Sequence, residues 1–168
     1  MGENEELKSR FAALIQEHGR SMYRSARALL PGDAQAQDAV GEAVLLAWQS
    51  FGKLRELQAA KGWLLKITVN CAYAQLRRDR RLVELEAAER VAAPEGEELP
   101  QTLWQAVLRL PEEQRLAVTL YYYEDMPVAH IARTLGIPQG TVKSRLSRGR
   151  ERLRQLLSEE DGYDVQRS

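Results

Sequence analysis

A basic segment in the last third of the chain carries side chains that can hydrogen-bond nucleic acid. Residues 143–154 contain six basic residues and one acid, which gives a net charge of +5. A helix that buries Val142 and Leu146 would direct four polar side chains outward, in pairs four residues apart: Lys143, Ser144, Ser147 and Arg148. Lys and Arg can donate to guanine O6 and N7, and Ser serves a base or a phosphate. The predicted chemistry is readout of duplex DNA.

The elements before this segment are those of a helix-turn-helix. Residues 128–135 form a short amphipathic pattern, Gly136 is the expected C-terminal cap, and the next helix is predicted over residues 141–157. Thr141 and the free amides at that helix start suit a phosphate, and Arg145 adds attraction to the DNA backbone. The competing interpretation is an ordinary helical hairpin with a solvated basic face. The near absence of neutralising acids favours DNA binding.

A second candidate surface lies in the first half of the chain, where polar and aromatic residues recur at three- and four-residue steps. Lys66, Asn70, Tyr73 and Arg77 share one face of a predicted helix, beside Trp63. Cations can hold phosphates, a ring can stack on an exposed base, and an amide can hydrogen-bond the edge of a flipped base. The combination suits unpaired DNA. For Trp63 alone the competing interpretation is a core position, and for Asn70 it is a capping or solvated amide.

Helices must position both surfaces, because Leu, Ala, Glu, Arg and Gln dominate the composition and Gly and Pro are sparse. Helices are predicted over residues 7–30, 33–51, from 63 onward, and over 101–110 and 112–124. The residues expected to face inward are Val40, Val44, Trp48 and Phe51 on the second helix, and Leu64, Ile67, Cys71 and Ala74 on the third. The predicted fold class is all-α, with an N-terminal helical bundle and a C-terminal helix-turn-helix domain.

An acidic stretch separates the two blocks. Residues 84–98 hold six Glu and one Arg, a net charge of −5, and the apolar pattern thins out there. We therefore predict four parts: a first domain over residues 1–83, a flexible acidic linker over 84–100, a second domain over 101–158 and a tail over 159–168. The overall net charge of zero is the sum of these opposite blocks.

Catalytic chemistry has no support in the sequence. His18 and His130 are isolated on amphipathic helices, Cys71 is the single cysteine, and no metal-ligand spacing or phosphate-cradling loop is visible. We expect no enzymatic activity, no metal and no cofactor. The single thiol, the acidic start and the lack of an apolar run of membrane-span length predict a cytoplasmic chain without membrane insertion.

Several stretches resemble a known family. Residues 110–115 (LPEEQR), 131–132 and 140–150 (GTVKSRLSRGR) resemble region 4 of the extracytoplasmic-function sigma factors of bacterial RNA polymerase, which reads the minus-35 promoter element. Residues 38–48 are similar to the polymerase-binding helix of that family, and residues 63–70 to its minus-10 segment. The resemblance implies three partners: core RNA polymerase, promoter DNA and an anti-sigma factor.

The resemblance also implies roles for individual residues. The residues implied to bind the minus-35 element are Thr141, Lys143, Ser144, Arg145, Ser147 and Arg148. The residues implied to bind the minus-10 element are Trp63, Lys66, Asn70, Tyr73 and Arg77. Polymerase binding falls to Asp38, Glu42 and Trp48. For Asp38 and Glu42 singly, helix-surface solubility explains the charge equally well.

Two other classes of protein compete with this interpretation. A repressor or activator could use the same helix-turn-helix, with the first block as a dimerisation domain, and would bind its duplex site without polymerase. A small helical hydrolase could use His18 or His130 as a base, provided that a partner acid or nucleophile lies close in space.

Overall fold

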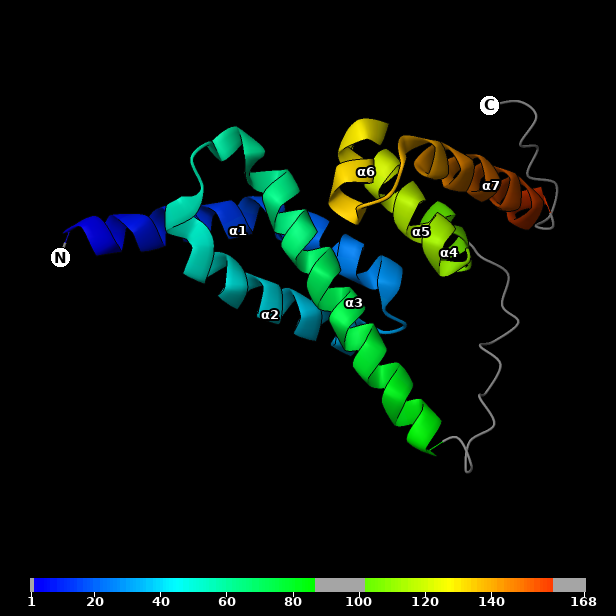
Figure 1. Ribbon diagram of the computed structural model, residues 1–168, viewed down its shortest axis with the longest axis horizontal. Coiled ribbons are helices and arrows are strands. Elements are labelled where there is room, and N and C mark those ends of the chain that lie inside the picture. Colours follow the sequence, from blue (N-terminus) through cyan, green and yellow to red (C-terminus); the bar gives the residue numbers. More distant parts are fainter. Residues whose placement is uncertain (1, 87–101, 159–168) are drawn as a thin grey trace. The chain divides into compact units, whose positions relative to one another are not determined.

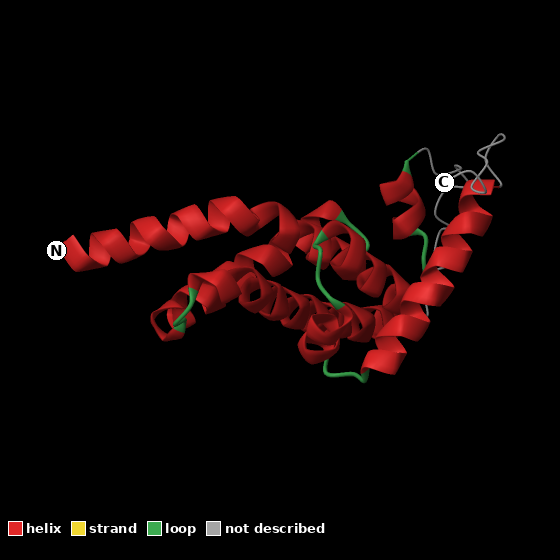
Figure 2. Cartoon of the chain, turned by 90° about the horizontal axis from the view of Figure 1, so that it is seen from above, coloured by secondary structure: helices red, strands yellow, loops and turns green. Residues whose placement is uncertain are grey.

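The computed structural model describes residues 2–86 and 102–158, and all regular structure in those two ranges is helical (Figures 1 and 2). The chain forms two compact units, Met1–Arg77 and Arg78–Ser168, and each is described by itself. The all-α prediction is confirmed. The predicted linker lies outside the described residues from position 87 onward. Within the described ranges, no helix combines the length and the apolar character needed to span a bilayer.

Three long helices build the first unit. They are α1 (Gly2–Leu29), α2 (Asp33–Ser50) and α3 (Ala60–Glu86), which belongs to this unit as far as Arg77. Two short 3-10 turns, η1 (Phe51–Lys53) and η2 (Leu57–Ala59), connect α2 to α3. Pro31 and Gly32 end α1, as the sequence predicts. The bundle interior contains Phe11, Leu14, Met22 and Leu29 of α1 and Leu64, Leu65 and Val69 of α3.

The inner face of α2 differs from the prediction. Its fully buried residues are alanines at three- and four-residue steps: Ala36, Ala39, Ala43 and Ala47. Val40, Val44 and Trp48, which were expected to face inward, are only half-buried. The prediction favoured large apolar residues, whereas close helix packing needs small ones where the backbones approach.

Aromatic rings close one end of this bundle. Phe11 of α1 lies 5.2 Å from the ring centre of Trp48 and 5.1 Å from that of Phe51. Both contacts are tilted, the arrangement that aromatic pairs prefer to a face-to-face sandwich. Phe51 is buried at the start of η1, so it ties the end of α2 to α1.

The turn between α1 and α2 is fastened by polar contacts. Tyr23 Oη donates a hydrogen bond to Asp33 Oδ1, and Gln37 Nε2 donates to Asp33 Oδ2 at 3.1 Å. Arg27 closes the end of α1 by donating to the Leu30 carbonyl at 2.8 Å. The hydrogen bond to Asp33, burial and the negative charge of Asp33 raise the pKa of Tyr23 above its ordinary value.

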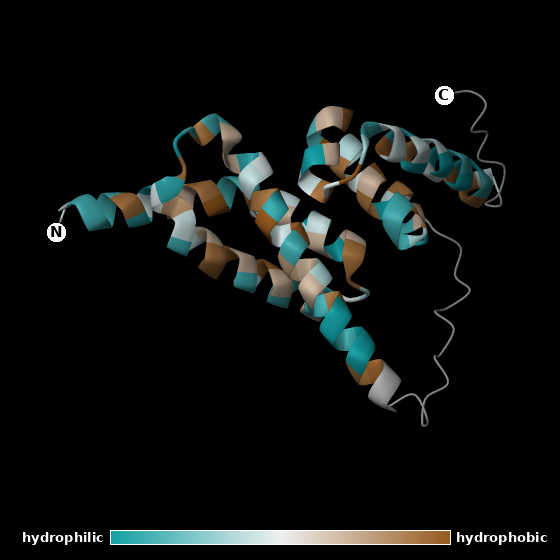
Figure 3. Ribbon diagram, in the orientation of Figure 1, coloured by the Kyte–Doolittle hydropathy of each residue, from teal (hydrophilic) through white to brown (hydrophobic). Residues whose placement is uncertain are grey.

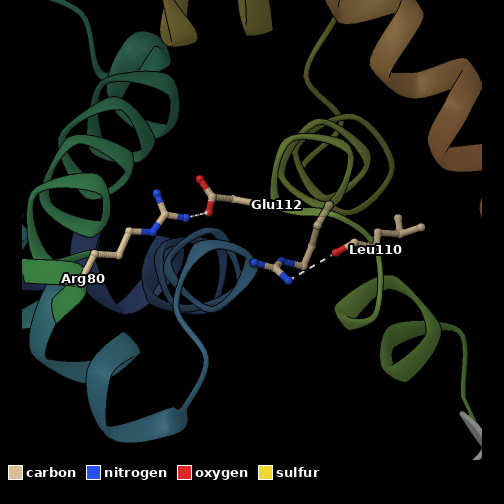
Figure 4. A network of polar contacts seen from close by, with 4 residues as sticks. Arg80, Leu110 and Glu112 are labelled. Atoms are coloured by element: carbon tan, nitrogen blue, oxygen red, sulfur yellow. Dashed lines mark hydrogen bonds and ion pairs between the residues drawn. The ribbon is translucent and has the colours of Figure 1, made fainter. Parts of the chain in front are cut away.

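Shorter elements build the second unit: α4 (Leu103–Leu108), α5 (Glu112–Val118), η3 (Thr119–Tyr123), α6 (Val128–Leu135) and α7 (Gln139–Ser158). Thr102 caps α4 by accepting from the Gln105 amide at 3.1 Å. Arg115 Nη1 donates to the Leu108 carbonyl at 3.3 Å and to the Leu110 carbonyl at 3.2 Å, and these bonds satisfy acceptors at the end of α4. Figure 4 shows the bond to Leu110.

The predicted helix over residues 112–124 is only partly regular. After α5 the chain continues as η3, a π-helical turn in which the Glu124 amide donates to the Thr119 carbonyl at 3.2 Å. Such wide turns inside helices occur often at functional sites.

Helices α6 and α7 form the predicted helix-turn-helix. Gly136 ends α6 at φ 67, a left-handed conformation that suits glycine, so its predicted capping role is confirmed. Ile131, Val142 and Leu146 are buried where α6 and α7 meet. Helix α7 also packs on α5, where Gly149 is buried.

Candidate nucleic-acid interface

The start of α7 presents the first candidate surface. Lys143, Ser147 and Arg148 are exposed, and Ser144 and Thr141 are half-buried. Val142 and Leu146 lie in the interior and fix the rotation of the helix, so the polar residues between them face solvent. In Figure 3 much of the α7 ribbon is coloured teal, which marks hydrophilic residues.

Arg145 lies on the flank of α7 that faces α5, beside Thr141 and Arg148, from which it is four and three residues away. It follows Lys143 by two positions, which rotates its side chain by roughly 200° around the helix. Its guanidinium lies 3.6 Å from the Glu113 carboxylate of α5, and its side chain is 19% exposed. The structure therefore places Arg145 against α5, at the border of the outward-facing surface and away from Lys143.

The second candidate surface lies along α3. Lys66, Asn70 and Arg77 are exposed, and Trp63 and Tyr73 are half-buried. All five belong to one uninterrupted helix, and their three- and four-residue spacing gives them a common face. The inner side of α3 is set by Leu64, Leu65, Thr68, Val69 and Ala72, which are buried. Ile67 and Ala74, expected to face inward, are half-buried.

A recess adjoins the N-terminal end of this face. It has a volume of about 410 Å³ and is lined by Ser50, Lys53, Leu54, Arg55, Glu56, Ala59 and Trp63. Trp63 therefore belongs both to the recess and to the face that carries Lys66 and Asn70. The residues between α2 and α3 that line this recess were not predicted from the sequence to belong to the site. Basic residues in a short connection directly before Trp63 were the available signal.

Arginines follow the same helix toward its C-terminal end. Arg77 and Arg81 are exposed. Arg80, which belongs to the second unit, forms an ion pair with Glu112 at the start of α5, with 2.5 Å between Nη2 and Oε2 (Figure 4). The carboxylate of Glu112 therefore partly neutralises Arg80, whereas Arg77 and Arg81 leave their charge on the exposed surface of the helix.

Helix α2 exposes a mixed acidic and apolar surface. Asp38 is exposed and Glu42 is half-buried, and Leu45 and Leu46 beyond them are 66% and 43% exposed. Spacings of three and four residues place these residues on the side of α2 away from its alanine stripe. Trp48 instead packs its ring against Phe11. Leu45 and Leu46 were not predicted as site residues, although leucines opposite an alanine stripe are a signal of contact with a partner.

The residues that a hydrolase would need are dispersed. His18 is half-buried on α1, with its Nε2 atom 3.9 Å from Glu17, and His130 is half-buried on α6. Cys71 is buried on α3. Among the residues that the structure describes, no three His, Cys, Asp or Glu side chains gather in a way that could hold a metal ion.

Known proteins resemble both halves of the chain. The family Sigma-70 region 2 matches residues 14–82, and the family Sigma-70, region 4 matches residues 101–153. The ECF RNA polymerase sigma factor SigM of Mycobacterium tuberculosis is 37% identical over 150 residues, which cover 88% of this chain and 76% of SigM. SigW of Bacillus subtilis is 28% identical over 167 residues, covering 88% of each chain. A similar solved structure is the sigma factor RpoE of Bartonella quintana in complex with the anti-sigma factor NepR. It matches with a TM-score of 0.74 at 25% identity, and the match covers 94% of this chain and 99% of the RpoE chain.

Proposed function

This chain belongs to the extracytoplasmic-function sigma factors of RNA polymerase, and we propose that its two polar surfaces divide promoter recognition between duplex and opened DNA. The start of α7 reads the minus-35 duplex, and the exposed face of α3 holds the opened minus-10 strand. The observation that carries this division is the different chemistry of the two surfaces. The first surface has cations and hydroxyls on a helix-turn-helix, and the second combines an amide and rings with cations.

On α7, Lys143 and Arg148 donate hydrogen bonds to base edges in the major groove. The hydroxyl groups of Ser144, Ser147 and Thr141 hydrogen-bond bases and phosphates. Arg145 contributes less directly to DNA binding, because it already forms an ion pair with Glu113 at 3.6 Å. The ion pair orients α7 on α5, and the charge of Arg145 adds to the positive potential near the DNA backbone.

On α3, Asn70 hydrogen-bonds the edge of an unpaired base, and Lys66 and Arg77 hold phosphates. The recess that contains Trp63, Lys53 and Arg55 accepts a base turned out of the duplex. Tyr73 completes the same face as a stacking surface.

The exposed side of α2 binds core polymerase through Asp38, Glu42, Leu45 and Leu46. Its carboxylates complement a basic partner surface. Burying its two leucines in the interface contributes favourable free energy to binding. Trp48 supports this helix from within, through its contacts with Phe11 and Phe51. The polymerase supplies the chemistry of synthesis, so this chain acts without catalysis of its own, in the cytoplasm. An anti-sigma factor controls it, as the RpoE complex with NepR suggests by analogy.

Transcription in vitro with purified core polymerase tests the division of labour. The assay measures holoenzyme binding to an upstream minus-35 duplex and, separately, promoter opening by the fluorescence of a reporter base in the minus-10 element. Lys143→Ala and Arg148→Ala should weaken duplex binding by about 5- to 100-fold, the range for one base contact. Asn70→Ala should reduce opening and leave duplex binding unchanged.

Arg10→Ala is the matched control, since Arg10 is an exposed cation on α1. It should alter neither step. Equal loss of both steps from Asn70→Ala would contradict the proposal. Tight duplex binding by the chain without polymerase would instead favour a repressor or activator.

A further inference from the structure

One buried polar side chain joins two helices of the first unit. Gln75 of α3 is 8% exposed, and its Nε2 atom donates a hydrogen bond to the main-chain carbonyl of Gln35 in α2 at 3.1 Å. The buried hydroxyls of Ser25 and Thr68 differ, because each donates to a carbonyl four residues earlier in its own helix, at 2.8 and 2.7 Å. Gln75 therefore makes a connection between helices that those two side chains do not make.

The acceptor of this bond is held in place. Gln35 lies in the first turn of α2, and Asp33 fastens the same turn by accepting hydrogen bonds from Tyr23 and Gln37. A Cβ atom at Gly32 would collide with Oε1 of Gln35, so the Gln35 side chain lies back over the turn that enters α2. The main-chain carbonyl of Gln35 is therefore a fixed point to which α3 is attached.

Gln75 lies behind the face that carries the minus-10 residues. It is two residues from Tyr73 and two from Arg77, and a step of two residues turns an α-helix by roughly 200°. Its side chain therefore leaves α3 on nearly the opposite side from Tyr73 and Arg77. Asn70, five residues earlier, is separated from it by about 140° around the helix. A bond that fixes the direction of Gln75 therefore fixes the direction of these three residues.

The bond also lies where α3 leaves the interior of the unit. The inner stripe of α3 runs through Leu64, Thr68 and Ala72, each fully buried, to Gln75. Among the residues of α3 whose burial the structure describes, none beyond Gln75 is buried. Apolar contacts are not directional, so they tolerate a small rotation of a helix, whereas a hydrogen bond weakens steeply away from its preferred angle. Buried polar groups fix the register of packed helices in coiled coils for the same reason.

We propose that Gln75 is a positioning residue for capture of the opened minus-10 strand. Its bond to Gln35 sets the rotation of α3 on α2, and this rotation aims Asn70, Tyr73 and Arg77 at the strand. Without the donor, the apolar stripe still holds α3 in the bundle, but the face samples several rotations. The inference rests on the proposed role of α3 in binding opened DNA. It adds a residue that touches no DNA and acts through those that do.

The test compares holoenzyme binding to a labelled single strand that carries the minus-10 element with binding to the upstream minus-35 duplex. Gln75→Met keeps the length of the side chain and removes the donor. It should weaken single-strand binding about three- to tenfold, the effect of one hydrogen bond, and leave duplex binding and affinity for core polymerase unchanged. Gln75→Leu removes the same donor with a different side-chain shape and should behave alike.

Thr68→Val is the matched control. It removes a buried hydroxyl from the same inner stripe, and the hydrogen bond that is lost lies within α3. It should weaken single-strand binding less than Gln75→Met does. In the Asn70→Ala background, Gln75→Met should have a smaller effect than in wild type, because one of the contacts that Gln75 aims is already absent.

Distances between spin labels separate positioning from a loss of stability. Labels at Ala34→Cys on α2 and Arg81→Cys on α3 occupy exposed positions, and Cys71→Ala removes the single native thiol. Gln75→Met should broaden the distance distribution measured by double electron–electron resonance, and Thr68→Val should leave it unchanged. A substitution that only lowered stability would leave the distribution of the folded chain as it is in wild type, so an unbroadened distribution in Gln75→Met would contradict the proposal.

Two patterns of results separate this inference from the proposed function. Unchanged single-strand binding in Gln75→Met and Gln75→Leu, with weakened binding in Asn70→Ala, would overturn the positioning role and leave strand capture by α3 intact. Unchanged binding in all three variants would overturn strand capture itself. Equal weakening of single-strand binding and core binding would also overturn the positioning role, since it would indicate a loss of folded chain. Circular dichroism of each variant establishes that the helices are formed.

Discussion

Gly149 shows how closely the helices of the second unit approach at a single residue. A Cβ atom built there would lie 2.7 Å from Val118 Cγ2, and Val118 is buried on α5. Valine has little freedom at χ1, so its methyl group cannot swing away. We expect Gly149→Ala to destabilise the second unit by about 1–2 kcal/mol, measured by urea unfolding.

Removing the obstructing methyl group should reverse the sign of that effect. In a Val118→Ala background, Gly149→Ala should stabilise α7 by about 0.5–1 kcal/mol, the usual gain when alanine replaces a helical glycine. Gly140→Ala is a control, because nothing lies within 4 Å of a Cβ at Gly140. If Gly149→Ala were equally destabilising in both backgrounds, the contact with Val118 would not be the cause.

Tyr23 provides a pH-dependent test at the same scale. Its pKa is raised in the folded chain, chiefly by its hydrogen bond to Asp33. A raised pKa means that the folded state favours the protonated phenol, so the stabilisation is complete below the unfolded pKa of about 10 and is lost as the pH rises through the folded pKa. Tyr23→Phe should therefore be less stable than wild type at pH 7–9, and the difference should shrink above about pH 10. A difference that stays constant to pH 11 would contradict this origin.

At the scale of the element, α2 has two faces with opposite requirements. The alanine stripe meets the core, whereas Leu45 and Leu46 face outward with Asp38 and Glu42. Leu45→Gln combined with Leu46→Gln should keep the free energy of unfolding within about 0.5 kcal/mol of wild type, as is usual for surface changes. The same variant should weaken binding to core polymerase, measured by fluorescence anisotropy of labelled chain.

The inner face of α2 supplies the contrasting variant. Ala43→Leu should cost about 1–3 kcal/mol of stability, because a larger side chain must enter a filled interior. If the leucine pair proved necessary for folding instead, α2 would contact the core on both sides and the polymerase-binding role of this face would fail.

The elements also show what the sequence could and could not predict. Helix periods, Pro31–Gly32 and Gly136 are local signals, and the helices and breaks that they predict are present. The alanine stripe of α2 and the rotation of Arg145 toward Glu113 depend on which neighbour each helix meets, which no local pattern contains. The π turn at η3 is also absent from a uniform helix over residues 112–124, because no local residue pattern marks where the hydrogen bonding widens.

At the scale of the whole molecule, each unit has its own core. Leu64, Leu65 and Met22 are buried within the first unit, and Leu116, Leu120 and Ile131 within the second. Each core is small, so each unit is only marginally stable and sensitive to single substitutions. Because the two cores are separate, a substitution can change the stability of the unit that carries one DNA-binding surface without changing the stability of the other unit.

The tryptophans allow this independence to be measured. Trp48 and Trp63 belong to the first unit, and Trp104, in edge-to-face contact with Tyr123 at 5.0 Å, belongs to the second. A Trp104→Phe chain therefore reports unfolding of the first unit, and a chain with Trp48→Phe and Trp63→Phe reports the second. Tyr23→Phe should shift only the first transition and Gly149→Ala only the second, because neither substitution touches the other core. If either substitution moved both transitions equally, the two units would unfold as one cooperative body, and separate tuning of the two DNA surfaces would be excluded.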